Sequence, residues 1–300
     1  MRFFSFGDRG ERIAVLVSDS EAVELTGLLP GDFTGQLSPM RRMIERYESL
    51  VPEIAAKAVS DDRIKIDGLS LAPPVPDPSK VIAAPVNYVD HMEEMSQDSH
   101  IDSLGVFLKA PSSVLAAGGV VRLPYTDRRF DQEGELALVI GRRARNVAVA
   151  DALHFIFGYT CLLDITMRGG EDRSTRKSFD SFTPMGPYLV TADEVGDLDS
   201  LELKCTVSGD LRQKVMIEDL IWGVPELVAY ASSVMTLLPG DVITTGTPKG
   251  VGPLQDGDSV TVEISRVGSL SVNVSADGAG LSPTKGANRG PVPPPAKERG

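Results

Sequence analysis

The sequence has few cysteines, few histidines and no long apolar runs. Its 300 residues include two cysteines and three histidines. The longest apolar stretches, such as 136–140, fall far short of the ~20 residues that cross a bilayer. Cys161 and Cys205 lie too far apart for a zinc ribbon or a disulfide framework, so two buried free thiols are expected. After Arg2 the next charged residue is Asp8, which comes too early for the apolar region of a signal peptide and predicts a cytoplasmic protein without a membrane partner.

Positive charge is also scarce. Thirty Lys and Arg residues against 42 Asp and Glu residues give a formal net charge of −12. Residues 278–300 carry four bases and one acid, so the rest of the chain stands at −15. A body this acidic repels phosphate backbones and anionic membranes, and nucleic acid is therefore not expected as a partner.

Residues 1–70 are predicted to form a small α/β domain. The β-branched runs at 13–17 and 22–25 are typical of paired strands. Apolar residues from Met40 to Ile54 recur at intervals of three and four, which predicts a helix that Pro52 kinks or ends. Residues 71–79 hold four prolines and are interpreted as a stiff linker between two domains.

Residues 80–277 are dominated by short strand patterns separated by glycine-rich turns, which favours an α+β, β-rich class with a partly closed sheet. The expected strands begin near positions 80, 120, 135, 157, 186, 201, 241, 259 and 270. Helical periodicity is confined to 149–155 and 224–235. Residues 278–300 contain ten Pro and Gly and no aromatic residue, which predicts a disordered tail.

Three acids stand at the ends of strand patterns. In an extended strand, Glu133 and Glu135 share one face at the start of a buried apolar run, where two carboxylates repel each other unless a cation lies between them. Asp164 ends a second apolar run. Together they can offer three oxygens to one hard divalent cation, Mg²⁺, Mn²⁺ or Ca²⁺. The alternative is that the glutamates face water on an edge strand and Asp164 caps a turn.

A histidine and a carboxylate form a second candidate group. His91 and Glu94 are three residues apart and share a face if this segment is helical. A carboxylate that holds one ring nitrogen leaves the other free to act as a base. The alternative is a chance pair on an exposed helix.

Two lysines and a glycine-rich turn complete the candidates. Lys109 follows the apolar residues VFL, and Lys177 stands in the segment RKSFDSFTPMGP. The alternative for each is a position on the surface, which is the usual state of a lysine. The segment TTGTPKGVG at 244–252 lacks the spacing of a nucleotide-binding loop. Its backbone amides, including that of Gly246, and the Thr247 hydroxyl are suited to hold a carboxylate, and the alternative is a tight turn.

In order along the chain, several segments resemble the fumarylacetoacetate hydrolase family from about Lys80 to Val274. These segments are NYVDHMEEM, FLKAPSS, DQEGELALVIG, GYTCLLDIT, RKSFDSFTPMGPYLVT, LLPGDVITTGTPKGVG and DGDSVTVEI. The resemblance implies a mixed β-roll catalytic domain, usually a homodimer, with Mg²⁺ or Mn²⁺ in its site.

The resemblance also implies roles for individual residues. Matched motif to motif, the metal ligands are Glu133, Glu135 and Asp164. The base and its orienting partner, on a lid, are His91 and Glu94, and Lys177 polarises the substrate oxygens or the water at the metal. Residues matched to substrate binding are Lys109, Arg168, Gly246 and Thr247.

One segment departs from the family pattern. After the metal-ligand aspartate the family often carries R-D-x-Q and a Trp-containing insert. Here Arg168 matches, but Gly169 and Glu171 replace the Asp and Gln, and only eight residues separate Arg168 from Lys177. The wall that faces the distal part of the substrate is therefore expected to differ.

The resemblance, with which the chemistry of these residues agrees, implies a metal-dependent hydrolase of a small-molecule 2-oxo acid. The expected reaction cleaves a carbon–carbon bond in a 2,4-dioxo acid of the acylpyruvate or fumarylacetoacetate type, through a metal-stabilised enolate. The same stabilisation serves two alternatives: a decarboxylase of oxaloacetate-like acids, and an isomerase or hydratase in aromatic catabolism. A third alternative, of another class, is a non-catalytic family member.

Overall fold

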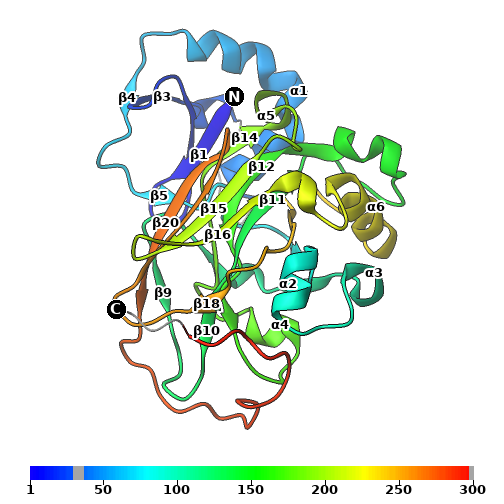
Figure 1. Ribbon diagram of the computed structural model, residues 1–300. Helices are drawn as coiled ribbons and strands as arrows, with labels where there is room; N and C mark the ends of the chain where they lie inside the picture. The colour runs from blue at the N-terminus through cyan, green and yellow to red at the C-terminus, as the bar shows by residue number, and fades with distance from the viewer. Residues whose placement is uncertain (30–36, 297–300) are drawn as a thin grey trace.

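The computed structural model describes residues 1–29 and 37–296 and is built around one large sheet (Figure 1). Most of its strands are antiparallel neighbours. In spatial order they are β4 (Ile64–Lys65), β3 (Glu21–Glu24), β2 (Arg12–Leu16), β1 (Arg2–Phe6), β14 (Thr183–Thr191), β12 (Ile156–Leu163), β11 (Gly134–Ile140), β17 (Val242–Thr244), β6 (Val81–Ala83) and β7 (Phe107–Lys109). Two short strands, β5 (Leu71–Ala72) and β8 (Val114–Leu115), pair with β1 and β14.

Two smaller sheets complete the β structure. The five-stranded sheet runs β16 (Asp210–Met216), β15 (Glu202–Val207), β19 (Ser259–Ile264), β20 (Gly268–Ser275) and β9 (Val120–Arg122). The three-stranded sheet runs β13 (Thr166–Met167), β10 (Phe130–Gln132) and β18 (Gly252–Pro253). The strands expected from residue 80 onward are therefore confirmed.

Helices are few and mostly short. The α-helices are α1 (Pro39–Ala58), α2 (Val89–Glu94), α3 (Ile101–Leu104), α4 (Arg173–Arg176), α5 (Ala192–Val195) and α6 (Val224–Val234). The 3-10 helices are η1 (Thr26–Leu28), η2 (Pro111–Ser113), η3 (Val149–Phe155) and η4 (Ile217–Asp219). No helix in the described ranges is both long and apolar enough to span a membrane.

Strand β11 is buried on both faces and lies at the centre of the fold. Leu136 and Leu138 pack into the core between the large sheet and the five-stranded sheet. Ala137 and Val139 point the other way, into a core that also contains Met40 of α1. Because side chains alternate along a strand, the unbroken apolar run of β11 serves two cores at once.

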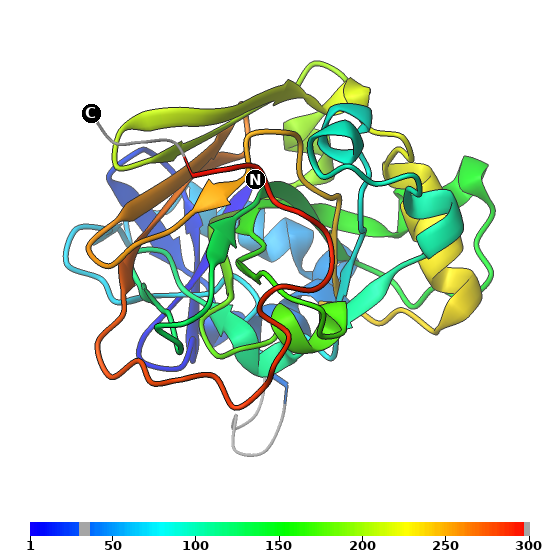
Figure 2. The same ribbon diagram turned by 60° about the horizontal axis from the view of Figure 1, so that its bottom comes forward.

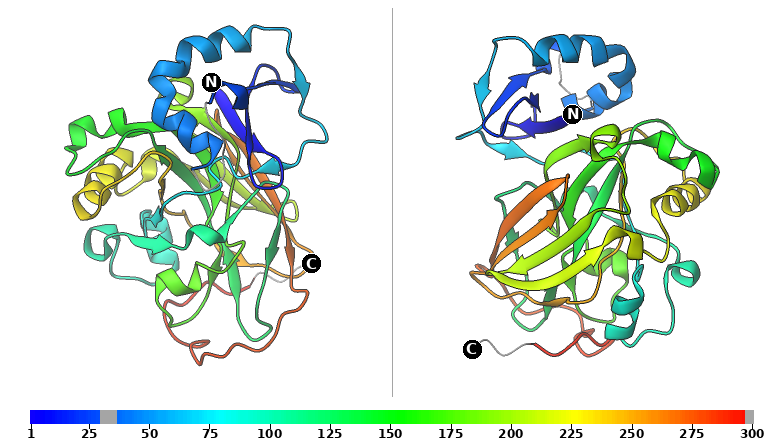
Figure 3. Two further views of the ribbon diagram at one scale, coloured as in Figure 1. Left: turned by 180° about the vertical axis from the view of Figure 1, so that it is seen from behind. Right: turned by 45° about the horizontal axis from the view of Figure 1, so that its top comes forward.

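The N-terminal segment extends the large sheet rather than standing apart from it (Figure 3). The predicted hairpin is confirmed as β2 and β3, and β1 pairs with β14 in the register Phe3↔Leu189. Helix α1 does not end at Pro52, contrary to one of the two expected outcomes. It continues to Ala58 because Ile54, beyond the proline, is fully buried against the sheet.

The proline-rich segment 71–79 packs against β1. Its first two residues form β5, paired with β1 in the register Ser5↔Ala72, and the Ser5 hydroxyl donates to the Pro74 carbonyl at 2.8 Å. Val75 is fully buried. The segment therefore packs against the sheet along its length from Leu71 to Val75. The domain boundary that it was predicted to mark stays a prediction.

The described part of the C-terminal tail, residues 278–296, crosses the end of the molecule that carries α4 and β18 (Figure 2). The Thr126 amide donates to the Gly280 carbonyl at 2.9 Å, and the Gly170 amide donates to the Gly286 carbonyl at 3.0 Å. The composition of the tail predicts disorder because the tail has few apolar side chains to bury. The described segment is instead held by backbone hydrogen bonds, which composition does not show. Residues 297–300 lie outside the described part.

Candidate active site

Strand register brings the three predicted acids together. Glu133 precedes β11, Glu135 is its second residue, and Asp164 directly follows the neighbouring strand β12. The Asp164 amide donates to the Glu133 carbonyl at 2.8 Å. Between the glutamates, Gly134 faces the five-stranded sheet, where a Cβ would lie 3.0 Å from the Cys205 Cβ. Both glutamates therefore point to the other side, as strand alternation predicts.

The three carboxylates form a set that can hold a metal ion. One oxygen from each lies within 4.8 Å of the others, and Glu133, Glu135 and Asp164 are all buried. The donors are all carboxylate oxygens, which is the chemistry that hard divalent cations such as Mg²⁺ and Mn²⁺ prefer. The residues present therefore fit the predicted metal.

Cationic side chains hold Glu133 in place. The Lys177 ammonium donates to Glu133 Oε2 at 2.7 Å, and the Arg168 guanidinium donates to Glu133 Oε1 at 3.0 Å. Burial opposes ionisation of Glu133, but these two cations together hold the pKa of its carboxyl well below the usual range. Lys177 also donates to Asp164 Oδ2 at 2.6 Å, so its ammonium lies between two of the metal-ligand candidates.

Lys109 contacts a protein carboxylate rather than open space for a substrate. Its ammonium forms a buried ion pair with Asp164 Oδ1 and donates to the Phe182 carbonyl at 2.9 Å. Burial lowers the pKa of Lys109. Lys109 thereby orients Asp164, and its predicted contact with substrate stays a prediction. Arg168 likewise binds Asp131 and Glu133, which makes it a support of the carboxylate cluster.

The surroundings of Glu135 disfavour its ionised form. Burial, followed by the nearby Asp164 carboxylate, raises the pKa of Glu135 to about 8. Its Oε2 atom accepts a hydrogen bond from the Gly246 amide at 2.9 Å. Gly246 has φ +89, and a Cβ there would lie 2.9 Å from the Asn87 Cβ. Gly246 thus positions Glu135, and its predicted contact with substrate stays a prediction.

The predicted histidine pair forms on α2. His91 Nδ1 lies 3.2 Å from Glu94 Oε2, and the other Glu94 oxygen accepts the Gly250 amide at 2.8 Å. Asp90 accepts the Lys249 amide at 3.3 Å, so α2 is fastened to the glycine-rich turn at two points. His91 is 6% exposed, which excludes the exposed-helix alternative.

Thr247 is buried beside the acids with its hydroxyl already engaged. The hydroxyl donates to the Gly134 carbonyl at 3.0 Å and accepts from the Gln213 amide at 2.7 Å. To hold a substrate carboxylate, the hydroxyl must exchange the Gly134 carbonyl for the substrate. The predicted role of Thr247 stays a prediction.

A small enclosed cavity joins these groups. It has a volume of about 30 Å³, and its lining includes His91, Glu133, Glu135, Lys177 and Thr247. Ligand pockets usually measure about 300–1,000 Å³, so this cavity must widen before a substrate can enter. The cavity also contains Arg176, a residue for which the sequence offered no signal beyond a run of basic residues.

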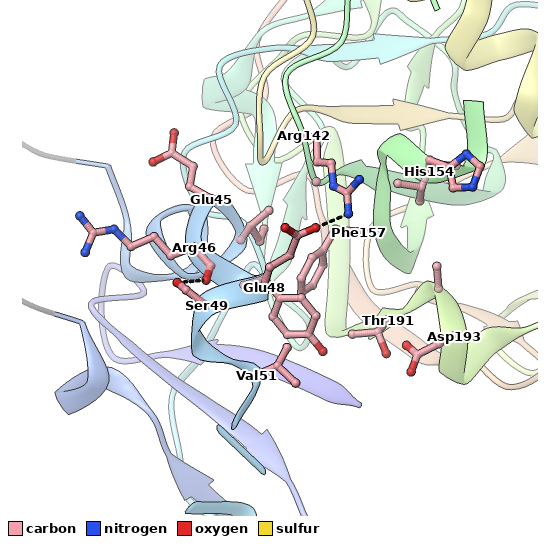
Figure 4. Close-up of a pocket in the computed structure, with 15 residues that line it drawn as sticks. Glu45, Arg46, Glu48, Ser49, Val51, Arg142, His154, Phe157, Thr191 and Asp193 are labelled. Atoms are coloured by element: carbon pink, nitrogen blue, oxygen red, sulfur yellow. Dashed lines mark hydrogen bonds and ion pairs between the residues drawn. The ribbon is translucent and has the colours of Figure 1, made fainter. Parts of the chain in front are cut away.

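A larger cavity of about 560 Å³ lies between α1 and the strands beside it, away from the acids (Figure 4). Glu48 and Arg142 form an ion pair there, and the Ser49 hydroxyl donates to the Arg46 carbonyl at 2.8 Å. These polar groups satisfy one another, whereas the groups around the small cavity converge on one point. The small cavity is therefore the candidate active site.

Comparison with known proteins agrees with this architecture. Residues 80–275 match the family described as fumarylacetoacetate (FAA) hydrolase, C-terminal. The chain belongs to the fumarylacetoacetate hydrolase family. This membership confirms the predicted family, the β-rich fold class and the enzyme class, a metal-dependent hydrolase.

Three relatives illustrate the range of the fumarylacetoacetate hydrolase family around this chain. A maleylpyruvate hydrolase of Aquipseudomonas alcaligenes is 41% identical over 276 residues, which cover 88% of this chain and 96% of that protein. A maleylpyruvate hydrolase from Sphingobium sp. SYK-6, whose crystal structure contains manganese(II) and pyruvate, is 39% identical in sequence. The two structures superpose with a TM-score of 0.81 over 94% of this chain and 100% of that chain. The mitochondrial oxaloacetate tautomerase of Xenopus laevis is 36% identical over 77% of each chain.

The segment in which this family member departs from the usual motif contacts the C-terminal tail. Glu171 forms an ion pair with Arg128, and the Thr284 hydroxyl contacts both side chains. The tail backbone passes so close to Gly169 that a Cβ on Gly290 would lie 2.3 Å from the Gly169 carbonyl oxygen. A Cβ on Gly169 would lie 3.1 Å from the Gly286 carbonyl oxygen, and one on Gly170 would lie 2.5 Å from the Arg289 Cβ, so these two glycines leave room for the tail. The sequence held no signal for this pairing.

Deleting residues 279–300 is expected to destabilise the protein. The deletion removes the Thr284 contacts to a buried ion pair and several backbone hydrogen bonds, each worth roughly 0.5–1.5 kcal/mol, against the entropy of ordering the segment. We expect a net loss of about 1–2 kcal/mol, seen as a lower melting temperature in scanning calorimetry. Thr284→Val should reproduce part of the loss, and a deletion that melts like the full chain would show that the tail is not docked.

Proposed function

We propose that this protein hydrolyses the carbon–carbon bond of a 2,4-dioxo acid and releases pyruvate and a second acid. The observation that carries the proposal is the position of His91, whose Glu94-bound ring lines the same small cavity as Glu133 and Glu135. A base and a hard-cation site in one buried cavity are the groups that this hydrolysis requires. The relatives named maleylpyruvate hydrolase support the choice of an acylpyruvate substrate.

Each residue has a defined task in this reaction. When bound at the carboxylates, a divalent cation polarises the 2-oxo acid and offsets the negative charge that develops on it. Glu94 holds His91 Nδ1, which leaves Nε2 free to take a proton from water. Lys177 lies between Glu133 and Asp164 and supplies a further positive charge next to the reacting oxygens.

The proton and electron balance follows from these positions. His91 accepts a proton from water, and the water oxygen forms a bond to the C4 keto carbon of the substrate. The C3–C4 bond then breaks with its electron pair moving to C3. The proton held by His91 is returned to C3, which becomes the methyl group of pyruvate. C4 leaves as the carboxylic acid of the second product, which keeps the other proton of the water and releases it to solvent on ionising.

A second candidate is keto–enol tautomerisation of an oxaloacetate-like acid. It is supported by relatives named oxaloacetate tautomerase, including one of Bacillus subtilis that is 38% identical over 68% of this chain and 72% of that protein. This reaction needs a base and a cation but no attacking water. Decarboxylation of the same acids uses the same groups and is distinguished by release of CO₂.

Turnover of acetylpyruvate and oxaloacetate with and without Mg²⁺ or Mn²⁺ tests the proposal. We expect metal-dependent loss of acetylpyruvate with pyruvate as product, and no comparable release of CO₂ from oxaloacetate. Turnover of oxaloacetate alone would favour the second candidate, and no turnover of either would favour a non-catalytic family member. The homodimeric state and the cytoplasmic location stay predictions, the first to be checked by light scattering.

A further inference from the structure

Arg176 is a buried cation without a protein counter-ion at the wall of the small cavity. It is the last residue of α4 and is 4% exposed. Its Nε and Nη1 atoms have no hydrogen-bond partner among the described residues. Its side chain nevertheless lines the cavity that contains Glu133, Glu135 and His91.

The other fully buried cations around the carboxylate cluster are paired, whereas Arg173, which also lines the cavity, is only partly buried. Lys109 binds Asp164, Arg168 binds Asp131 and Glu133, and Lys177 binds Glu133 and Asp164. The carboxylate cluster is thus held without Arg176. No hydrogen bond or ion pair among the described residues joins Arg176 to Glu133, Glu135 or Asp164, so Arg176 does not orient these carboxylates.

An unpaired buried guanidinium is costly in the ligand-free protein. Removing a charge from water without a partner costs several kcal/mol. Burial lowers the pKa of Arg176 only to about 10, so it stays charged at neutral pH. Its planar fork of N–H donors matches the two oxygens of a carboxylate, which is the ligand that offsets this cost.

The charge balance of the cavity points to a dianion. Its lining contains two carboxylates, Glu133 and Glu135, and four cations, Arg168, Arg173, Arg176 and Lys177. A divalent ion at the acids adds two further positive charges. A 2,4-dioxo acid with a second carboxylate supplies two negative charges, whereas acetylpyruvate supplies one.

We propose that Arg176 binds a second carboxylate of the substrate, at the end of the acyl chain remote from the 2-oxo acid group. This inference rests on the proposed function, because it takes the 2-oxo acid end to lie at the carboxylate cluster. It makes Arg176 a specificity-determining residue that selects acylpyruvates with an acidic acyl chain.

Calorimetric binding to the Mn²⁺-loaded protein tests the role of Arg176. The probes are 2-oxoheptanedioate and 2-oxoheptanoate, which differ only in the terminal carboxylate. We expect the diacid to bind the parent protein ~10–100-fold more tightly, the range of a hydrogen bond to a charged group. In Arg176→Gln that advantage should disappear, while affinity for the monoacid should change by less than about twofold because its binding does not involve Arg176.

Controls separate this role from a structural one. Arg142→Gln, at the larger cavity, removes one positive charge and should keep the diacid preference. Without ligand, Arg176→Gln should melt at the parent temperature or above, because it removes an unpaired buried charge. Equal binding of both probes by the parent protein, an equal loss for both probes in the variant, or a lower melting temperature of the variant would each overturn the proposal.

Two separate measurements keep this inference distinguishable from the proposed function. Acetylpyruvate lacks the second carboxylate, so its hydrolysis by the parent protein tests the proposed function and does not test Arg176. A parent protein that hydrolyses no acylpyruvate would end the proposed function, whereas the two-probe binding experiment would still report whether Arg176 recognises a terminal carboxylate.

Discussion

Replacing Glu135 with alanine is expected to abolish metal-dependent activity in a protein that stays folded. The variant retains two of the three clustered carboxylates, too few to hold a hard divalent ion at micromolar concentration. Burial and Asp164 raise the pKa of Glu135 to about 8, so its removal also relieves repulsion in the metal-free protein. The melting temperature without metal should therefore hold or rise.

Calorimetric titration of the metal-free protein with Mg²⁺ or Mn²⁺ alone measures this effect without turnover. Glu263→Ala provides the matched control, since Glu263 is an exposed glutamate on β19 and its removal should change neither metal affinity nor activity. Unchanged metal affinity in Glu135→Ala would rule Glu135 out as a ligand.

The second large effect is expected at the histidine. His91→Ala should lower kcat on a 2,4-dioxo acid by ~10²–10⁴, the usual contribution of a general base. Metal affinity should not change, because His91 is not among the clustered carboxylates. Glu94→Gln should cause a smaller loss, since it weakens the 3.2 Å contact that orients the ring but leaves the base in place.

His154→Ala is the matched control, because His154 lies at the larger cavity. If the reaction needs no attacking water, His91→Ala should act only by impairing closure of α2 over the substrate. KM and kcat should then change together. Kinetics from pH 5 to 9 on acetylpyruvate and oxaloacetate separate these cases. A His91→Ala enzyme that hydrolyses acetylpyruvate at the parent rate would contradict the general-base role.

The sequence predicts the reactive groups because local periodicity places them. Strand alternation puts Glu133 and Glu135 on one face, and helical spacing joins His91 to Glu94. Asp164 at the end of an adjacent strand completes the cluster. Each of these relationships spans a few residues or one strand pair, which a pattern can show.

Other features depend on contacts between distant segments and left no pattern to detect. The ion pair of Lys109 with Asp164 spans 55 positions, and the Gly246 amide reaches Glu135 across 111. Both residues position acids, which the sequence patterns did not show, and their predicted substrate contacts stay predictions. The pairing of Phe3 with Leu189 and the docking of the tail are equally invisible to composition.

The most direct test of the central claim is the fate of the water oxygen. Acetylpyruvate is incubated with the Mn²⁺-loaded protein in ¹⁸O-labelled water, and the products are identified by mass spectrometry. Carbon–carbon hydrolysis predicts equal amounts of acetate and pyruvate, with enzyme-dependent incorporation of one labelled oxygen into acetate. Interconversion of keto and enol forms without cleavage, or pyruvate formed without labelled acetate, would contradict it.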